Sequence, residues 1–191
     1  MKICISKRNM KLGKIANISL APILSCDKKV ECSKDCYALK AYRLYPNVKK
    51  AWADNLKIYR KDPDLYFNTI DKFLSNGKTS FFRWQQAGDI YDQAYYNRMV
   101  EIAKKYKDIK FLVFTKKYHL DFSTKPDNLE IVFSAWPGRG IPKTKFKIAW
   151  MNDGIENRIP KNAIECPGNC ENCGMCWNLS KLNKDVYFNK H

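Results

Sequence analysis

Residues 80–115, SFFRWQQAGDIYDQAYYNRMVEIAKKYKDIKFLVFT, contain two apolar runs separated by an amphipathic stretch. The two ends are short and rich in aromatic residues, which is typical of buried strands. The middle places apolar side chains three and four positions apart, as on one face of a helix. We therefore expect strands at 80–86 and 110–115 and a helix at 93–106. A strand, a helix and a strand in this order favour a parallel sheet.

The same alternation extends to both sides of this stretch. The apolar patterns predict further strands at 15–23, 129–134 and 146–150 and helices at 37–60 and 65–74. The predicted fold is α/β, an incomplete (β/α) barrel, with an open doubly wound sheet as the rival arrangement. We expect a single domain, 1–191, with an α/β core at 1–151 and a cysteine-rich, loop-dominated C-terminal segment at 152–191.

Seven of the eight cysteines lie in two tight clusters. Thiolates a few residues apart can converge on one metal ion or iron–sulfur cluster. Disulfides are the other explanation, but the basic, polar start of the chain does not resemble a secretory signal, so we expect a reducing, cytoplasmic location. Cys4 stands alone and is expected to be a small buried hydrophobe. The candidate metal ligands are Cys26, Cys32, Cys36, Cys166, Cys170, Cys173 and Cys176.

The two clusters differ in the number of thiolates that they offer. The first supplies three, which suits a [4Fe–4S] cluster with one iron open to a small ligand, or a structural site completed by a distant residue. The second has the spacing C-x3-C-x2-C-x2-C and is closer to a ferredoxin-type run than to paired zinc knuckles. We expect iron–sulfur binding, by one cluster or two, with zinc as the alternative metal.

Polar residues follow two of the predicted strands. Functional groups collect beyond the carboxyl ends of parallel strands, so these residues are expected at one rim. A carboxylate there can accept from an ammonium or a ribose hydroxyl, and a lysine can meet a carboxylate or phosphate; plain turns and solvated lysines are the alternatives. The candidate cofactor-binding residues are Gly88, Asp89, Thr115 and Lys116.

The chain is strongly basic, with 35 Lys and Arg against 19 Asp and Glu, a formal net charge of +16. Such a charge attracts phosphate polymers, so nucleic acid is a possible partner. A lysine-rich solvated surface gives the same composition. No uncharged apolar run approaches the ~20 residues of a membrane span, so no membrane partner is expected.

Several short motifs occur in a fixed order: Cys32-Ser-Lys-Asp-Cys36-Tyr37-Ala38, Gly88-Asp89, Phe114-Thr115-Lys116-Lys117 and the closing cysteine run. In these motifs the chain resembles a phage family known as gene product 88, over about Ile15 to Trp177. They also resemble, distantly, radical S-adenosylmethionine (SAM) barrels, in which three cysteines follow the first strand and SAM binds the open iron. The spacing in that superfamily is C-x3-C-x2-C, whereas here it is C-x5-C-x3-C. The resemblance implies a phage protein with cysteine-bound iron–sulfur, active in the host cytoplasm, and supplies no established reaction.

Three functions fit these observations. The preferred one is a small radical-SAM-like iron–sulfur enzyme, with SAM as a possible cofactor and a reductase or ferredoxin-type electron donor as partner. The second is a non-catalytic iron–sulfur or zinc module that binds nucleic acid or a host protein. The third is a one-cluster electron carrier or redox sensor, in which thiolates from both ends of the chain share the cluster.

Overall fold

The structure, a computed structural model, describes residues 1–27, 31–155 and 158–189. Within these residues the strands form one sheet in which all neighbouring strands are parallel. The sheet curls into a half-barrel, so the expected α/β fold and partial barrel are confirmed, rather than an open doubly wound sheet. The strand order is β1 (Ala16–Asn17), β2 (Phe81–Trp84), β3 (Lys110–Thr115), β4 (Leu129–Ser134), β5 (Lys147–Asn152), β7 (Val186–Asn189), β6 (Ile164–Glu165).

Along the sequence, the long helices come between β1 and β2 and between β2 and β3. The α-helices are α1 (Tyr37–Leu44), α2 (Pro46–Lys61), α3 (Pro63–Leu74), α4 (Gln93–Lys105), α5 (Cys170–Cys173) and α6 (Leu179–Leu182), and two 3-10 turns are η1 (Glu31–Ser33) and η2 (Met175–Asn178). Aspartates cap two of the long helices: Asp62 accepts from Leu65 N at the start of α3, and Asp92 accepts from Tyr95 N at the start of α4.

The helix predicted at 37–60 is two helices. Tyr45 has an extended backbone, and Pro46 is the first residue of α2. A residue that precedes proline is disfavoured in the helical region, whereas proline itself fits the first turn of a helix. Pro46 therefore ends one helix and starts the next. The apolar periodicity continues across this proline and did not indicate the break.

The strand predicted at 15–23 is much shorter than expected. Only β1 pairs as a regular strand, with Ala16 opposite Phe82. The buried residues that follow stay beside β2 through single hydrogen bonds, from Ile18 N to Arg83 O (3.2 Å) and from Leu20 N to Ala87 O (3.1 Å). The segment lies where predicted, although it does not form a continuous ladder.

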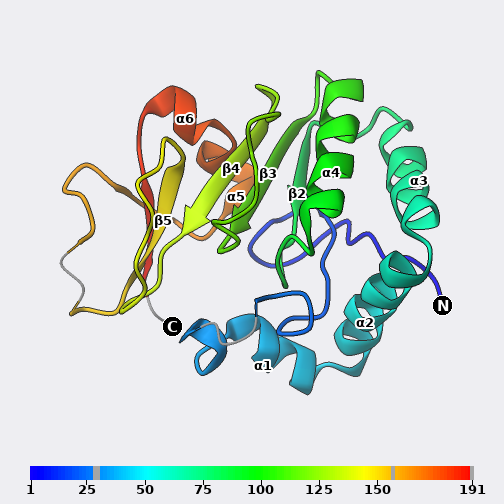
Figure 1. The fold of residues 1–191 in the computed structure, drawn as a ribbon, viewed down its shortest axis with the longest axis horizontal. Coiled ribbons are helices and arrows are strands. Elements are labelled where there is room, and N and C mark those ends of the chain that lie inside the picture. The colour runs from blue at the N-terminus through cyan, green and yellow to red at the C-terminus, as the bar shows by residue number, and fades with distance from the viewer. Residues whose placement is uncertain (28–30, 156–157, 190–191) are drawn as a thin grey trace.

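Side chains alternate between the two faces of the sheet and form two cores. From β3, Phe111 and Val113 join the core under α2, α3 and α4, while Leu112 faces the opposite side. The opposite side is covered by the C-terminal segment through Trp177 and Leu179. Figure 1 shows the long helices on one side of the sheet and the orange and red C-terminal segment on the other.

The C-terminal segment contains more regular structure than expected. Its strand β7 lies between β5 and β6, with Trp150 opposite Tyr187. Asp185, just before β7, accepts from Ile148 N and from Trp150 Nε1, both at 2.9 Å. Strands of two and four residues carry too little periodicity to be recognised in a loop-rich sequence. Their positions become evident only from their partners, because β7 pairs with β5 and β6 pairs with β7.

Candidate metal centres

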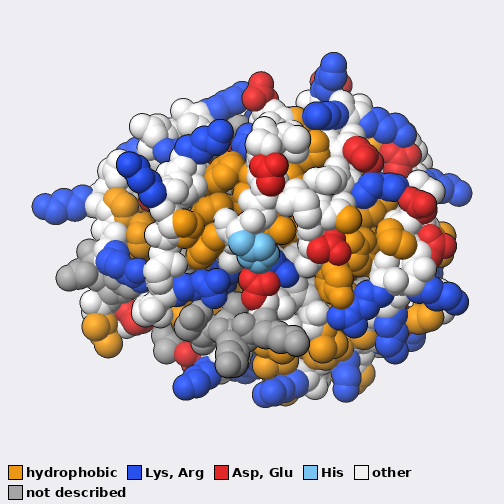
Figure 2. All heavy atoms as spheres, in the orientation of Figure 1, with side chains coloured by type: hydrophobic (Ala, Val, Ile, Leu, Met, Phe, Trp, Pro, Cys, Tyr) orange, Lys and Arg blue, Asp and Glu red, His pale blue; other side chains and the backbone are white. Residues whose placement is uncertain are grey.

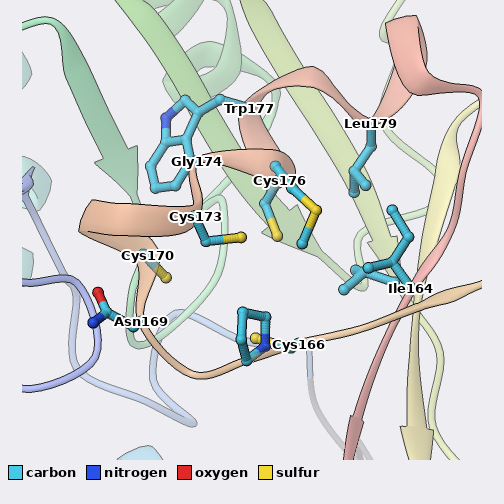
Figure 3. Close-up of a pocket in the computed structure, with 12 residues that line it drawn as sticks. Ile164, Cys166, Asn169, Cys170, Cys173, Gly174, Cys176, Trp177 and Leu179 are labelled. Carbon is cyan, nitrogen blue, oxygen red and sulfur yellow. The ribbon is translucent and has the colours of Figure 1, made fainter.

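The C-terminal cysteines gather around one cavity. The thiols of Cys166, Cys170, Cys173 and Cys176 line a space of about 20 Å³, and each of these residues is half-buried. Figure 3 shows the four sulfurs around the same region, with Trp177 and Leu179 on either side of them. The structure thus brings together all four predicted ligands of the second cluster.

Local backbone features set this arrangement. Asn169 caps α5, which ends at Gly174 in the left-handed region, with φ +60°. Glycine tolerates this conformation without strain. The turn directs the chain into η2, where buried Trp177 donates Nε1–H to Phe82 O (3.2 Å) and packs edge-on to Phe81. The cysteine run is therefore anchored to β2 immediately after its last thiol.

A tight N-terminal turn packs against the same cysteine run. Cys170 N donates to Lys11 O (2.9 Å), and Lys14 N donates to a Glu171 carboxylate oxygen (3.1 Å). Gly13, with φ +62°, lies so close that a Cβ there would stand 2.6 Å from Glu171 Cβ. The N-terminal turn and the C-terminal cysteine run thus build one site. The sequence predicted the cysteine run but not the contribution of the N-terminal turn.

A cation lies beside these thiols. The Arg83 guanidinium stacks 4.0 Å from the centre of the Phe114 ring, and its Nε donates to Trp84 O (3.1 Å). Its positive charge opposes the rise in the thiol pKa at Cys176 and Cys170. Among the residues that the structure describes, no carboxylate forms an ion pair with Arg83.

Burial keeps two thiols of this site, those of Cys170 and Cys176, protonated when no metal is bound. It raises the pKa of Cys176 to about 12 and also raises the pKa of Cys170. Metal ligation requires thiolates, so binding at this site has to release protons.

The three N-terminal cysteines lie in the loop between β1 and α1. Cys26, Cys32 and Cys36 are half-buried. Burial, with smaller contributions from the Asp89 carboxylate and the other two thiols, raises the pKa of Cys26 to about 12. These thiols and Asp89 are therefore close enough to interact, as expected for a shared site at the end of β2.

Asp89 is held rigidly at the rim of the sheet. Its Oδ1 accepts from Thr115 Oγ1 (2.6 Å) and Ile90 N (2.8 Å), and its Oδ2 accepts from Lys116 N (3.0 Å). Burial raises the pKa of this carboxyl group, whereas the three hydrogen bonds lower it. A carboxylate has about four acceptor positions, so one remains for a further donor.

Lys116 extends this network to β4. Its Nζ donates to Ser134 Oγ (2.9 Å) and lies 5.7 Å from the centre of the Trp136 ring. Burial raises the pKa of Cys32, and the charges of Lys116 and Arg139 oppose part of this rise. The predicted residues after β2 and β3 thus meet at one rim, together with the cysteine loop.

Gly88 approaches the protein's own chain. It has φ +77°, and a Cβ at this position would lie 2.8 Å from Leu20 O. The glycine lets the end of β2 pack against the segment that leads into the cysteine loop. Its lack of a side chain therefore positions Asp89, which donates its backbone N–H to Ser25 Oγ (3.3 Å).

Comparison with known proteins assigns the chain to a family. The model of the family described as gene product 88 matches residues 3–179. The chain belongs to the gene product 88 family. No curated protein and no solved structure matches it. The radical-SAM likeness thus stays a proposal.

One structural finding bears on the metal assignment, and another concerns the helices. Over residues 1–27, 31–155 and 158–189, no group of three or more His, Cys, Asp or Glu side chains is arranged to hold a metal ion. The four C-terminal thiols line one cavity, but in this structure they are not arranged around a metal ion. In the same described residues, no helix is both long and apolar enough to cross a membrane.

The structure corrects the expectation for one residue, Cys4, and assigns contacts to two others, Lys117 and Arg83. Cys4 is exposed rather than buried, because it is the backbone of this residue that binds the Asn55 side chain, at 2.8 Å and 3.0 Å. Lys117 contacts Asp27, beside the first cysteine, at 2.9 Å, and so ties the cysteine loop to β3. Arg83 could have been placed by strand alternation, since Phe82 and Trp84 face the other core.

Proposed function

We propose that this protein is an iron–sulfur redox protein with a C-terminal [4Fe–4S] centre on Cys166, Cys170, Cys173 and Cys176. The observation that carries the proposal is the convergence of four thiols from one short segment on a single cavity. Four cysteine thiolates are the usual ligands of such a cluster. The neighbouring Arg83 supports an anionic centre, because a desolvated cation without a carboxylate partner is costly unless an anion lies beside it.

The N-terminal thiols form the second half of the proposal. Three thiolates leave one iron of a [4Fe–4S] cluster without a protein ligand, so a small chelating molecule such as SAM can bind there. Asp89 keeps one acceptor position for the ammonium group of that molecule, and Lys116 offers a cation for its carboxylate. This arrangement favours a redox enzyme over an electron carrier, with a reductase or ferredoxin-type protein as electron donor.

Each residue at this rim has a defined task in the proposal. Thr115 and the backbone of Lys116 hold the Asp89 carboxylate in place. The carboxylate would therefore stay fixed when a ligand binds and would orient that ligand. Burial keeps bulk water from competing for the carboxylate. When bound, the cluster would supply one-electron transfer to the ligand held beside it.

The test is anaerobic purification with iron, acid-labile sulfide and zinc measured per chain. We expect about eight irons for two clusters. Cys173→Ser should lose about four of them, whereas Cys4→Ser, which removes the isolated exposed thiol, should lose none. Stoichiometric zinc without iron would overturn the iron–sulfur assignment.

A second function is favoured by a basic groove on another part of the surface. The N-terminal segment, α2 and α3 enclose a groove of about 560 Å³, lined by Lys2, Lys7, Lys50 and Lys72 over Phe73. Lys50 pairs with Asp54 at 2.6 Å, while the other three lysines have no acidic partner in the part of the chain that the structure describes. Cations around an aromatic ring suit single-stranded nucleic acid.

A further inference from the structure

The Arg83 guanidinium lies beside the C-terminal cysteines and, within residues 1–27, 31–155 and 158–189, forms no ion pair with a carboxylate. Desolvation lowers the pKa of this guanidinium, which means that the charge is less stable here than in water. Its hydrogen bond to Trp84 O and its contact with Phe114 satisfy the group only partly. Phe114, the ring on which the guanidinium stacks, packs in the same cluster as Cys166, Cys170 and Cys176. The charge of Arg83 interacts first with the Tyr37 hydroxyl and then with these three thiols.

The same cation also reaches toward the N-terminal site. Arg83 interacts with Tyr37, which follows Cys36 and donates its hydroxyl proton to Gln86 O. The N-terminal thiols act on Tyr37, whereas Arg83 itself acts on Cys176 and Cys170 of the C-terminal group.

We infer that Arg83 is the counter-charge of the C-terminal thiolate centre and sets the stability of its reduced state. This inference rests on the proposed function. A [4Fe–4S] cluster with four thiolates carries two negative charges when oxidised and three after it takes up one electron. A half-buried cation beside it stabilises the more negative form and so raises the reduction potential.

The experiment compares two cations near Cys170. Arg83 is desolvated, whereas Lys11, whose charge also acts on Cys170, is exposed and screened by water. Arg83→Gln removes the charge, Arg83→Lys keeps it, and Lys11→Gln is the matched control. Each variant is titrated with dithionite as electron donor while the cluster spectra are recorded, and Cys173→Ser identifies the signal of the C-terminal cluster.

We expect Arg83→Gln to lower the ratio of reduced to oxidised C-terminal cluster at least about tenfold at a fixed potential, which is 59 mV for a one-electron couple. Arg83→Lys should restore most of the shift, and Lys11→Gln should change the ratio less than about threefold. If Arg83 had a purely structural role, Arg83→Gln and Arg83→Lys would change the ratio of reduced to oxidised cluster by similar amounts. Unchanged potentials in an Arg83→Gln protein with full iron content would overturn the inference.

A second readout separates this inference from the proposed function. If the protein holds zinc, the iron–sulfur proposal fails, but the thiolate centre is still anionic and Arg83 is still its counter-charge. Chelator competition should then show about tenfold weaker zinc binding in Arg83→Gln than in Arg83→Lys. Equal metal retention in both variants would reject the inference for either metal.

Discussion

At the scale of single residues, the rim of the sheet is organised around Asp89. Three donors from two strand ends hold its carboxylate, and one of them, Thr115, is itself fully buried. Thr115 Oγ1 donates to Asp89 and accepts from Lys117 N (2.9 Å), so one hydroxyl serves two buried partners. Removing a hydroxyl of this kind leaves both partners unsatisfied.

Thr115→Val should therefore destabilise the protein by about 1–3 kcal/mol, although it preserves the shape of the side chain. It should also raise the pKa of Asp89 further, because the Thr115 hydrogen bond lowers it. The matched control is Thr69→Val on α3, where the hydroxyl bonds only Leu65 O and the expected change is within about 0.5 kcal/mol. Chemical denaturation measures both; equal effects would show that Thr115 has no special role.

Gly13 tests the contact between the two ends of the chain. Gly13→Ala should cost more than Gly77→Ala, because both glycines have positive φ but a Cβ at Gly77 would meet nothing within 4 Å. The backbone penalty of about 1–2 kcal/mol is common to both, and the excess at Gly13 reports the clash with Glu171. Hydrogen exchange at Cys170 N–H should accelerate only in the Gly13 variant. The same stability for both variants would contradict the packing described.

At the scale of elements, the C-terminal segment is held by the sheet as well as by any metal. Trp177 and Leu179 pack on β3 and β4, and Val186 begins the strand beside β5. Ser180 N and Oγ both contact the buried Glu130 carboxylate of β4. The segment should therefore keep part of its order when the cysteines carry no metal.

Trp177→Ala should destabilise the protein by about 3–5 kcal/mol, since it empties a buried site and removes the bond to Phe82 O. Limited proteolysis should then cut first between residues 153 and 185. Trp52→Ala is the control, because Trp52 is half-buried and stacks only on Tyr42. Cleavage at the same sites and rates in both variants would show that Trp177 does not anchor the segment.

The burial of thiols in the C-terminal segment also predicts how metal binding depends on pH. Thiols with a raised pKa stay protonated, so each one that binds metal releases a proton and the apparent affinity rises about tenfold per pH unit per thiol. Because the pKa of Cys176 is about 12, this rise should continue above pH ~9, where ordinary thiols are already ionised. Chelator competition from acid to alkaline pH measures the slope. A plateau near pH ~8.5 would mean that the thiols are not shielded from water.

At the scale of the whole molecule, positive charge is spread widely. Figure 2 shows Lys and Arg side chains over the entire visible face, with acidic side chains between them. A net charge of +16 alone therefore does not define a binding site. In the groove of Lys2, Lys7 and Lys72, lysines with no acidic partner among the described residues lie around the Phe73 ring.

Binding of single-stranded DNA should weaken with salt, with a slope of about −2 if three lysines each contact one phosphate. Lys7→Glu with Lys72→Glu should reduce this slope by at least about 1.4. Lys104→Glu with Lys107→Glu, which changes the charge equally at exposed positions away from the groove, should have much less effect. If the two double variants behave alike, lysines bind nucleic acid nonspecifically and the groove is not a site.

The sequence by itself determined the elements whose signals are local. Apolar runs placed β3 and β4, and the cysteine spacings grouped the candidate ligands. Strand ends after β2 and β3 correctly indicated a shared rim, because parallel strands present their carboxyl ends at one edge.

Only the tertiary structure decided which distant residues complete each site. The contact of Gly13 with Glu171 joins opposite ends of the chain, and Arg83 reaches the thiols because β2 turns that side of the strand toward the C-terminal segment. The exposure of Cys4 and the pairing of β7 with β5 likewise depend on neighbours far away in sequence. Patterns along a chain report the period of one element, whereas burial and charge pairing are set by whichever elements pack together.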